Sequence, residues 1–264
     1  PPKTPLGHEK LVKTAQNFED LGAEYFSVTF GAGGSTQQGT INTCSSLFDS
    51  TKVPIAPHIS GIGSDKDVIS LTLNQYKDKG LKKLVVLRGD LPSGFGAIGD
   101  FPYAVDLIDY INIEFENYFE IEVGAYPETH PEAISPEQDI KYFCEKMSRN
   151  IQGAVTQFFY DPEVYFRFVE NCQKYGCDKP ITPGIMPITN KDALIRMASN
   201  CGAKLPESLL QKLDSYSNEE DIEKFGSDYV SSLVRTLINN GAPGIHFYTI
   251  NKLEPTKQII DLLD

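Results

Sequence analysis

The chain has 264 residues, of which 40% are hydrophobic, and its formal net charge is −12. Single α/β barrels run to about 250 residues and no Ser/Gly/Pro-rich linker divides the chain, so we predict one domain over residues 1–264. The acidic balance argues against a nucleic-acid or anionic-membrane surface, because either would need clustered Lys and Arg.

The cysteine pattern and the absence of sorting signals predict a cytoplasmic protein. The five cysteines are scattered and contain no CxxC pair, so we expect reduced thiols and no zinc site. Neither a signal-peptide pattern nor an apolar run of about 18 residues occurs, so we expect no membrane span. The sequence begins with Pro1 and Pro2 and has no Met before them, so we expect that a native N-terminal segment is missing.

Apolar spacing predicts one leading helix, Leu6 to Leu21, closed by Gly22, and then strands and helices in alternation. The strands are predicted at 24–30, 54–60, 84–87, 121–126, 153–160, 181–188 and 244–250. The later helices are predicted at 40–48, 65–79, 102–116, 136–147, 162–175, 190–199, 206–213, 220–239 and 255–263. Two internal prolines weaken the prediction at 181–188.

The predicted strands follow one another mostly at the spacing of about 30 residues that a βα unit requires. Seven strands after an orphan helix indicate a (β/α)8 TIM-type barrel whose first strand lies upstream of residue 1. An open, doubly wound sheet is the alternative.

Polar residues follow the predicted strands. The apolar run 84–87 leads directly into Arg88, Gly89 and Asp90, which places a cation and a carboxylate at the carboxyl end of a buried strand. Ligands of α/β proteins bind at these strand ends, and in a barrel all of them meet on one face. The other polar residues at such positions are Thr29, His58, Ser60, Tyr126, Glu128, His130, Gln157, Tyr248 and Asn251.

Common catalytic and phosphate-binding motifs are weak or missing. Gly94 to Gly99 matches GxGxxG, but six residues separate it from the preceding strand, so a loop is the better interpretation. The Gly-rich run 31–36 lacks the Lys-Ser/Thr ending of a P-loop. No histidine pair has metal-motif spacing, His246 lies mid-strand where we expect it to be packed, and no GxSxG elbow occurs.

Several strings resemble those of methylenetetrahydrofolate reductase, in order and along the whole chain. They are TFGAGGST at 29–36, PH at 57–58, LRGDLP at 87–92, AYPETHPE at 125–132, TQFFYD at 156–161, PGIMP at 183–187 and HFYTIN at 246–251. The length is similar to that of the short bacterial type, which has the catalytic barrel alone.

The resemblance implies a (β/α)8 barrel with non-covalent FAD and a small-molecule folate substrate. NADH or NADPH would reduce the flavin, which would then reduce 5,10-methylenetetrahydrofolate to 5-methyltetrahydrofolate in a ping-pong hydride transfer. It also implies a homo-oligomer. By position, the FAD contacts are Thr29, His58, Arg88, Gly89, Asp90, Tyr103, Ala104, Gly124, Tyr126, His130, Asp139 and Lys146. The folate or nicotinamide contacts are Gln157, Tyr248 and Lys252.

Two positions depart from the pattern of the family. Glu145 stands where the family can have a basic residue, and Lys252 where it can have Arg. Lys and Arg are not interchangeable at a bidentate site, so these departures bear on pyrophosphate and substrate binding.

Two acidic residues are expected to have chemical roles, one from the resemblance and one, Asp90, from the Arg88-Gly89-Asp90 turn. A general-acid Glu belongs to a Glu-Phe-Phe-Pro-Pro motif, and the chain begins at the Pro-Pro of that motif, so we expect this Glu in the missing first strand. Asp90 is the catalytic residue that we predict within the chain. A carboxylate beside the flavin N1 edge would disfavour the anionic reduced flavin and make it a better hydride donor.

Two other classes of function stay open at this point. Arg88, Lys146 and the Gly-rich loops also suit a flavin-free barrel lyase or aldolase that acts on a phosphorylated metabolite. A non-catalytic flavin- or folate-binding protein is the second alternative. No ribose-reading motif distinguishes NADH from NADPH.

Overall fold

The structure is a computed structural model that describes residues 1–30, 34–89 and 98–263, with the backbone alone at 34–36. The chain forms two compact units, which are described separately below. Unit 1 comprises Pro1–Val123 and Ser148–Gln152, and unit 2 comprises Gly124–Met147 and Gly153–Asp264.

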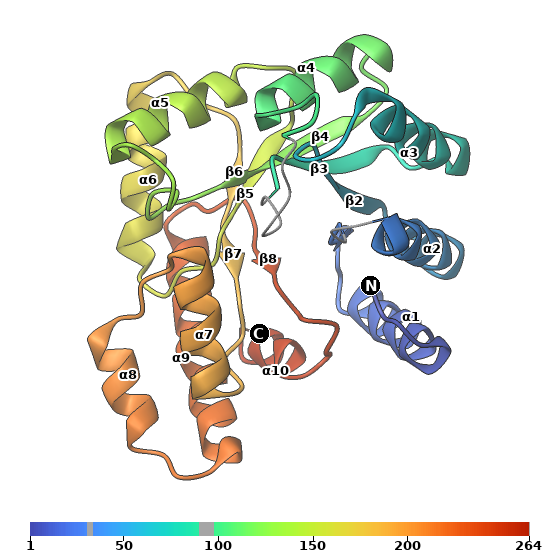
Figure 1. Cartoon of the computed structure of the whole chain (residues 1–264). Helices are drawn as coiled ribbons and strands as arrows, with labels where there is room; N and C mark the ends of the chain where they lie inside the picture. Colours follow the sequence, from blue (N-terminus) through green and yellow to red (C-terminus); the bar gives the residue numbers. More distant parts are fainter. Residues whose placement is uncertain (31–33, 90–97, 264) are drawn as a thin grey trace. The chain divides into compact units, whose positions relative to one another are not determined.

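Helices and strands alternate along most of the chain (Figure 1). The strands are β1 Phe26–Val28, β2 Ile55–Ser60, β3 Lys83–Leu87, β4 Glu120–Ala125, β5 Gly153–Thr156, β6 Ile181–Thr182, β7 Gly184–Ile185 and β8 His246–Phe247. The helices are α1 Pro5–Asp20, α2 Gly34–Ser50, α3 Lys66–Lys79, α4 Ala104–Glu114, α5 Pro136–Met147, α6 Pro162–Lys174, α7 Lys191–Cys201, α8 Glu207–Asp214, α9 Glu219–Asn239 and α10 Thr256–Asp261.

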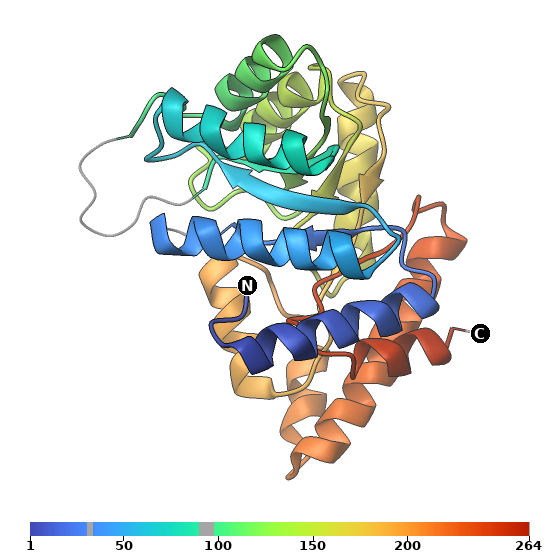
Figure 2. The same ribbon diagram turned by 90° about the vertical axis from the view of Figure 1, so that its right-hand side faces the viewer.

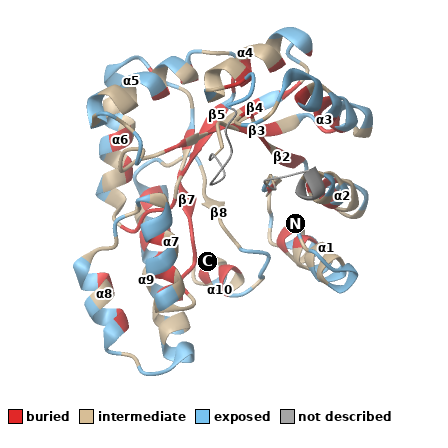
Figure 3. Ribbon diagram, viewed as in Figure 1, coloured by how far each residue is buried: buried red, intermediate tan, exposed pale blue. Residues whose placement is uncertain are grey.

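Unit 1 is built on parallel strands. β1 pairs with β2, β2 with β3, and β3 with β4, and the register sets His58 opposite Val85. The middle of this sheet is buried, as Figure 3 shows for β2 and β3, with Ile59 and Leu84 fully inaccessible to solvent. Helix α2 packs on β2, α4 packs on β3, and α1 lies beside α2 (Figure 2). These apolar strands form the core that supports the loops at their carboxyl ends.

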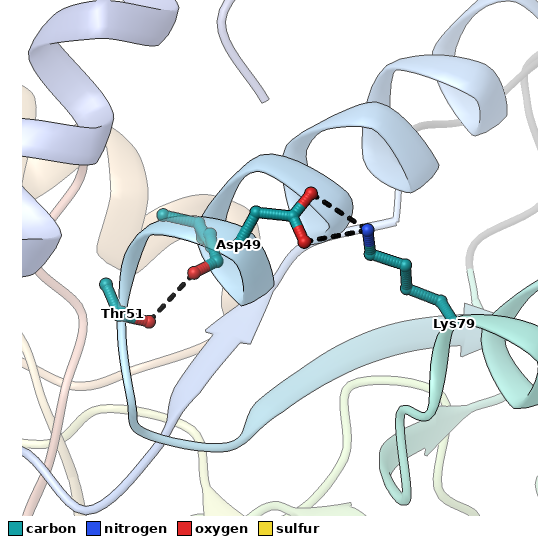
Figure 4. Close-up of polar contacts among 4 residues, drawn as sticks. Asp49, Thr51 and Lys79 are labelled. Atoms are coloured by element: carbon teal, nitrogen blue, oxygen red, sulfur yellow. Dashed lines mark hydrogen bonds and ion pairs between the residues drawn. The ribbon is translucent and has the colours of Figure 1, made fainter.

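Local signals in the sequence define the helix ends of unit 1. The side chain of Asp65 caps α3 by accepting from the Val68 N–H, and Gly80 ends the helix at φ 88°, a left-handed conformation that glycine adopts readily. At the same end of α3, the Lys79 ammonium bridges both carboxylate oxygens of Asp49 at 2.9 and 2.8 Å (Figure 4). This pair is solvent-exposed and contributes at most about 1 kcal/mol.

Unit 2 corrects the predicted strand 181–188, which is two short strands instead of one. Pro183 separates β6 from β7, because proline has no N–H to donate to a ladder. β6 pairs in parallel with β5, whereas β7 pairs in parallel with β8. The Pro183 carbonyl still accepts from the His246 N–H at 3.0 Å. The chain therefore changes its strand partner at Pro183, from β5 to β8.

The predicted fold class is confirmed as α/β of the (β/α)8 type, with parallel pairing in both units. Each predicted helix is present, although α2 starts at Gly34, earlier than the predicted position 40. Three predicted strands are much shorter than expected: 24–30, 153–160 and 244–250 contain only β1, β5 and β8. Within the described part of the chain, no helix is both long and apolar enough to cross a membrane. The single-domain assignment stays a prediction.

Candidate functional site

The turn after β3 is bonded to the end of β2. The Arg88 carbonyl accepts two hydrogen bonds, from the Ser60 hydroxyl at 2.8 Å and from the Ile62 N–H at 2.8 Å. Gly89 has φ 86°, and a Cβ placed there would lie 1.8 Å from Ser60 Oγ and 2.9 Å from Ile62 Cγ2. Only glycine fits this turn, so its backbone can closely approach a ligand.

We expect Gly89→Ala to destabilise the protein more than Gly63→Ala does. Both glycines have positive φ, but nothing lies within 4 Å of a Cβ at Gly63. Gly63→Ala should therefore cost only the left-handed strain of about 1 kcal/mol. Gly89→Ala should cost about 1–2 kcal/mol more, because the Ser60 hydroxyl must leave the Arg88 carbonyl. Urea unfolding of both variants measures the difference, and equal losses would mean that the contact with Ser60 is unimportant.

The other predicted flavin contacts of unit 1 lie within or directly beside three different elements. Thr29 follows β1, and its carbonyl accepts from the buried Thr40 hydroxyl at 3.1 Å. His58 lies within β2 and is half-buried. Tyr103 precedes α4 with 64% exposure and donates its N–H to Asp106, while Ala104 begins the helix. Asp90 falls outside the described residues.

Hydrogen bonds join four of the five predicted flavin contacts of unit 2 in two pairs, and a ring contact adds the fifth, Tyr126. The rings of Tyr126 and His130 meet edge to face with centroids 4.5 Å apart. The His130 N–H donates to the Asp139 carboxylate at 2.7 Å, which ties the loop after β4 to α5. His130 Nδ1 accepts the Glu132 N–H at 3.1 Å, so the neutral ring carries its proton on Nε2. In this tautomer, His130 has a ring N–H donor at Nε2.

Lys146, near the end of α5, is the cation of this group. Its ammonium donates to the Gly124 carbonyl at 2.8 Å, so both of these predicted contacts are also joined. Burial lowers the pKa of Lys146 to about 8, and the negative charge of Asp139 opposes that shift. An anion bound beside the Lys146 ammonium would compensate for its lost hydration and stabilise its charged form.

A cavity of about 410 Å³ opens beside the loop after β4, within unit 2. Its walls come from that loop, from α5 and α6, and from the segment between α7 and α8. Glu128 in its wall accepts the Lys204 N–H at 2.8 Å, and desolvation raises the pKa of this carboxyl. The lining residues include Tyr126, Asp139, Arg167, Phe168, Asn171 and Lys204.

The three predicted folate or nicotinamide contacts differ in exposure. Gln157 follows β5 directly and is half-buried. The Tyr248 hydroxyl donates to the Thr156 carbonyl at 2.7 Å, so Tyr248 also lies at the end of β5. Lys252 is exposed, and it follows a turn in which Ile250 and Asn251 have φ 50° and 57°. A β-branched residue at positive φ is strained, a condition that occurs most often at functional sites.

Sequence reasoning missed some residues of this region. Thr156 was part of a recognised string but was not singled out, yet its hydroxyl and carbonyl each accept a hydrogen bond. Arg167 and Lys204 line the cavity, but neither follows a predicted strand or belongs to a motif in the sequence. No local signal could have found them, because the fold alone brings their segments together.

Comparison with known proteins identifies the family. The sequence model named methylenetetrahydrofolate reductase matches residues 1–264. The chain is 31% identical over 264 residues to 5,10-methylenetetrahydrofolate reductase of Escherichia coli, covering all of this chain and 88% of that protein. It is also 31% identical to methylenetetrahydrofolate reductase (NADH) 1 of Arabidopsis thaliana, covering 95% of this chain and 45% of that protein. The chain thus spans about half the length of its plant relatives.

A solved structure shares the fold. It is an uncharacterized protein from Clostridium thermocellum that binds two copies of 5-methyl-5,6,7,8-tetrahydrofolic acid. The TM-score is 0.62 with 14% identity, and the match covers all of this chain and 91% of that one. Identity this low concerns the fold alone, whereas the sequence matches extend along the whole chain. The chain therefore belongs to the methylenetetrahydrofolate reductase family.

Proposed function

We propose that this protein reduces 5,10-methylenetetrahydrofolate to 5-methyltetrahydrofolate with FAD and a reduced nicotinamide. The family match along all 264 residues carries this proposal. NADH is the reductant that we favour, because the names of the matching plant relatives specify NADH. The five free thiols suit the reducing cytoplasm, where we place the protein. Self-association remains a prediction.

The residues present suit a bound flavin dinucleotide. An anionic diphosphate needs cations and N–H donors, and unit 2 offers the Lys146 ammonium and His130 Nε2–H. Because Gly89 has no side chain, a ligand could closely approach the backbone of the turn after β3. The other residues that we propose as FAD contacts are Thr29, His58, Arg88, Asp90, Tyr103, Ala104, Gly124, Tyr126 and Asp139.

When bound, FAD would supply the two-electron chemistry that links nicotinamide to folate. The protein's own residues bind and orient the reactants. Asp90, outside the described residues, is proposed to hold a negative charge next to the flavin. Gln157, Tyr248 and Lys252 are proposed to serve the folate or nicotinamide. The folate named for the structural relative from Clostridium thermocellum supports a folate ligand for this fold.

The decisive experiment is an anaerobic visible spectrum of the purified protein. We expect a flavin band that bleaches with NADH and returns when methylenetetrahydrofolate is added. Bleaching without return would keep the oxidoreductase but point to a truncated or altered folate half-reaction. A folded sample with no flavin band, even after FAD is added, would contradict the reductase and favour the flavin-free lyase or aldolase. Flavin that NADH cannot bleach would favour a non-catalytic binding protein.

A further inference from the structure

The hydroxyl of Tyr248 forms a hydrogen bond with the backbone of β5. It donates to the Thr156 carbonyl at 2.7 Å, and burial raises the pKa of the phenol, so it stays a donor at physiological pH. Tyr248 is itself held in place, because its N–H donates to the Ile185 carbonyl at 2.8 Å. Its ring also packs against that of His246, with the ring centroids 5.2 Å apart. Tyr248 thus connects the end of β8 to the end of β5.

The end of β5 forms two further hydrogen bonds. The Thr156 hydroxyl accepts the Gly184 N–H at 2.9 Å, and the Gln157 N–H donates to the Ala125 carbonyl at 2.7 Å. Thr156 is fully buried, so its carbonyl cannot turn to water if the Tyr248 hydroxyl is removed. The backbone leading into Gln157 is therefore fixed by its neighbours on both sides.

The Gln157 carboxamide has one defined orientation. Its Oε1 accepts the Phe158 N–H at 3.0 Å, and because a backbone N–H can only donate, the oxygen must face that group. Its Nε2 therefore points the other way with two N–H donors, and no described residue accepts from them. Such a group suits the acceptor oxygens and ring nitrogens of a planar heterocycle.

We propose that Tyr248 is a positioning residue for the folate, acting through Thr156 to hold the Gln157 donors in place. This role rests on the proposed function. Direct contact of the Tyr248 hydroxyl with the folate is not required, because its single proton already lies in the bond to Thr156. Loss of this bond should weaken folate binding.

Tyr248→Phe tests the role, and Tyr165→Phe is the matched control. The Tyr165 hydroxyl makes the same kind of bond, to the Ile181 carbonyl at 2.8 Å, in the same unit but to β6 and not to the residue that precedes Gln157. Both variants lose one tyrosine-to-carbonyl bond, so thermal unfolding should show similar small losses of stability. Tyr248→Phe should raise the KM for methylenetetrahydrofolate and the Kd for 5-methyltetrahydrofolate about fivefold, the equivalent of about one hydrogen bond.

The outcomes separate this role from the proposed function. If the wild-type protein turns over the folate but Tyr248→Phe and Tyr165→Phe have equal KM and Kd values, the positioning role is overturned alone. If both half-reactions of Tyr248→Phe slow equally without a change in KM, a general structural role replaces it. If the wild-type protein neither binds nor turns over the folate, the proposed function fails, and the positioning role fails with it.

Discussion

Gly184→Ala is expected to destabilise unit 2 by about 3 kcal/mol, a large part of the stability of an ordinary domain. A Cβ at this position would lie 2.0 Å from the Thr156 carbonyl oxygen and 2.6 Å from Tyr248 Cε2. The nearest atom belongs to the backbone of a buried strand and cannot rotate away. The added methyl group must therefore separate β7 from β5 or displace the Tyr248 ring.

Gly244→Ala is the matched control for this prediction. It adds the same methyl group in the same unit, but nothing lies within 4 Å of a Cβ there. We expect its midpoint of urea unfolding to stay close to that of the wild-type protein, while that of Gly184→Ala falls strongly. A Gly184→Ala protein as stable as Gly244→Ala would show that β5 and β7 are not in close contact.

The affinity for FAD is expected to fall about tenfold between pH 7 and pH 9. The pKa of Lys146 is lowered to about 8 by burial, so most molecules carry this charge at pH 7 and few carry it at pH 9. A bound diphosphate would raise this pKa, so FAD binding takes up a proton above about pH 8. Titration calorimetry in buffers of different ionisation enthalpy measures this uptake directly.

Two substitutions in α5 test the assignment to Lys146. Lys146→Met removes a charged contact and should raise the Kd for FAD about 10- to 100-fold at pH 7, and it should abolish the pH dependence. Lys141→Met removes an exposed lysine that pairs with Glu137 at 2.9 Å, and it should leave both properties unchanged. A pH dependence that persists in Lys146→Met would assign the titration to another group.

The same lowered pKa affects folding, with a defined sign. Between about pH 8 and the ordinary lysine pKa of 10.5, the unfolded chain keeps a proton on Lys146 that the folded protein has lost. The free energy of unfolding of the flavin-free protein should therefore gain from this group as the pH rises through that window. Below about pH 8, the folded state bears the full cost of burying the charge.

Local features of the sequence were sufficient for most elements and for the family. Helix α5, Pro136–Met147, has its predicted bounds, because a proline start and apolar residues at helical spacing define it locally. The strings around Arg88, Tyr126 and Gln157 indicated the family that the comparisons identify. Each string is contiguous, so its recognition needs no knowledge of what lies beside it in space.

Strand lengths were less predictable, because they depend on partners elsewhere in the chain. Aromatic residues at 158–160 extend the apolar segment beyond β5, but only Gly153–Thr156 form the strand. The run 181–188 reads as one strand, yet Pro183 divides it between the partners β5 and β8. An apolar pattern indicates that a segment is buried. Whether the segment forms a hydrogen-bonded strand depends on which other segment packs beside it.

The sequence by itself thus determined the α/β alternation, the family and the residue types at the strand ends. Only the tertiary structure decided which of those residues form hydrogen bonds and which have shifted pKa values. The Tyr248 hydroxyl bonds to a carbonyl 92 positions earlier, and Glu128 accepts from an N–H 76 positions later. The lowered pKa of Lys146 follows from burial, which no local pattern sets. Hydrogen bonds between distant segments and desolvation are properties of the packed chain, so they arise only when the elements are brought together.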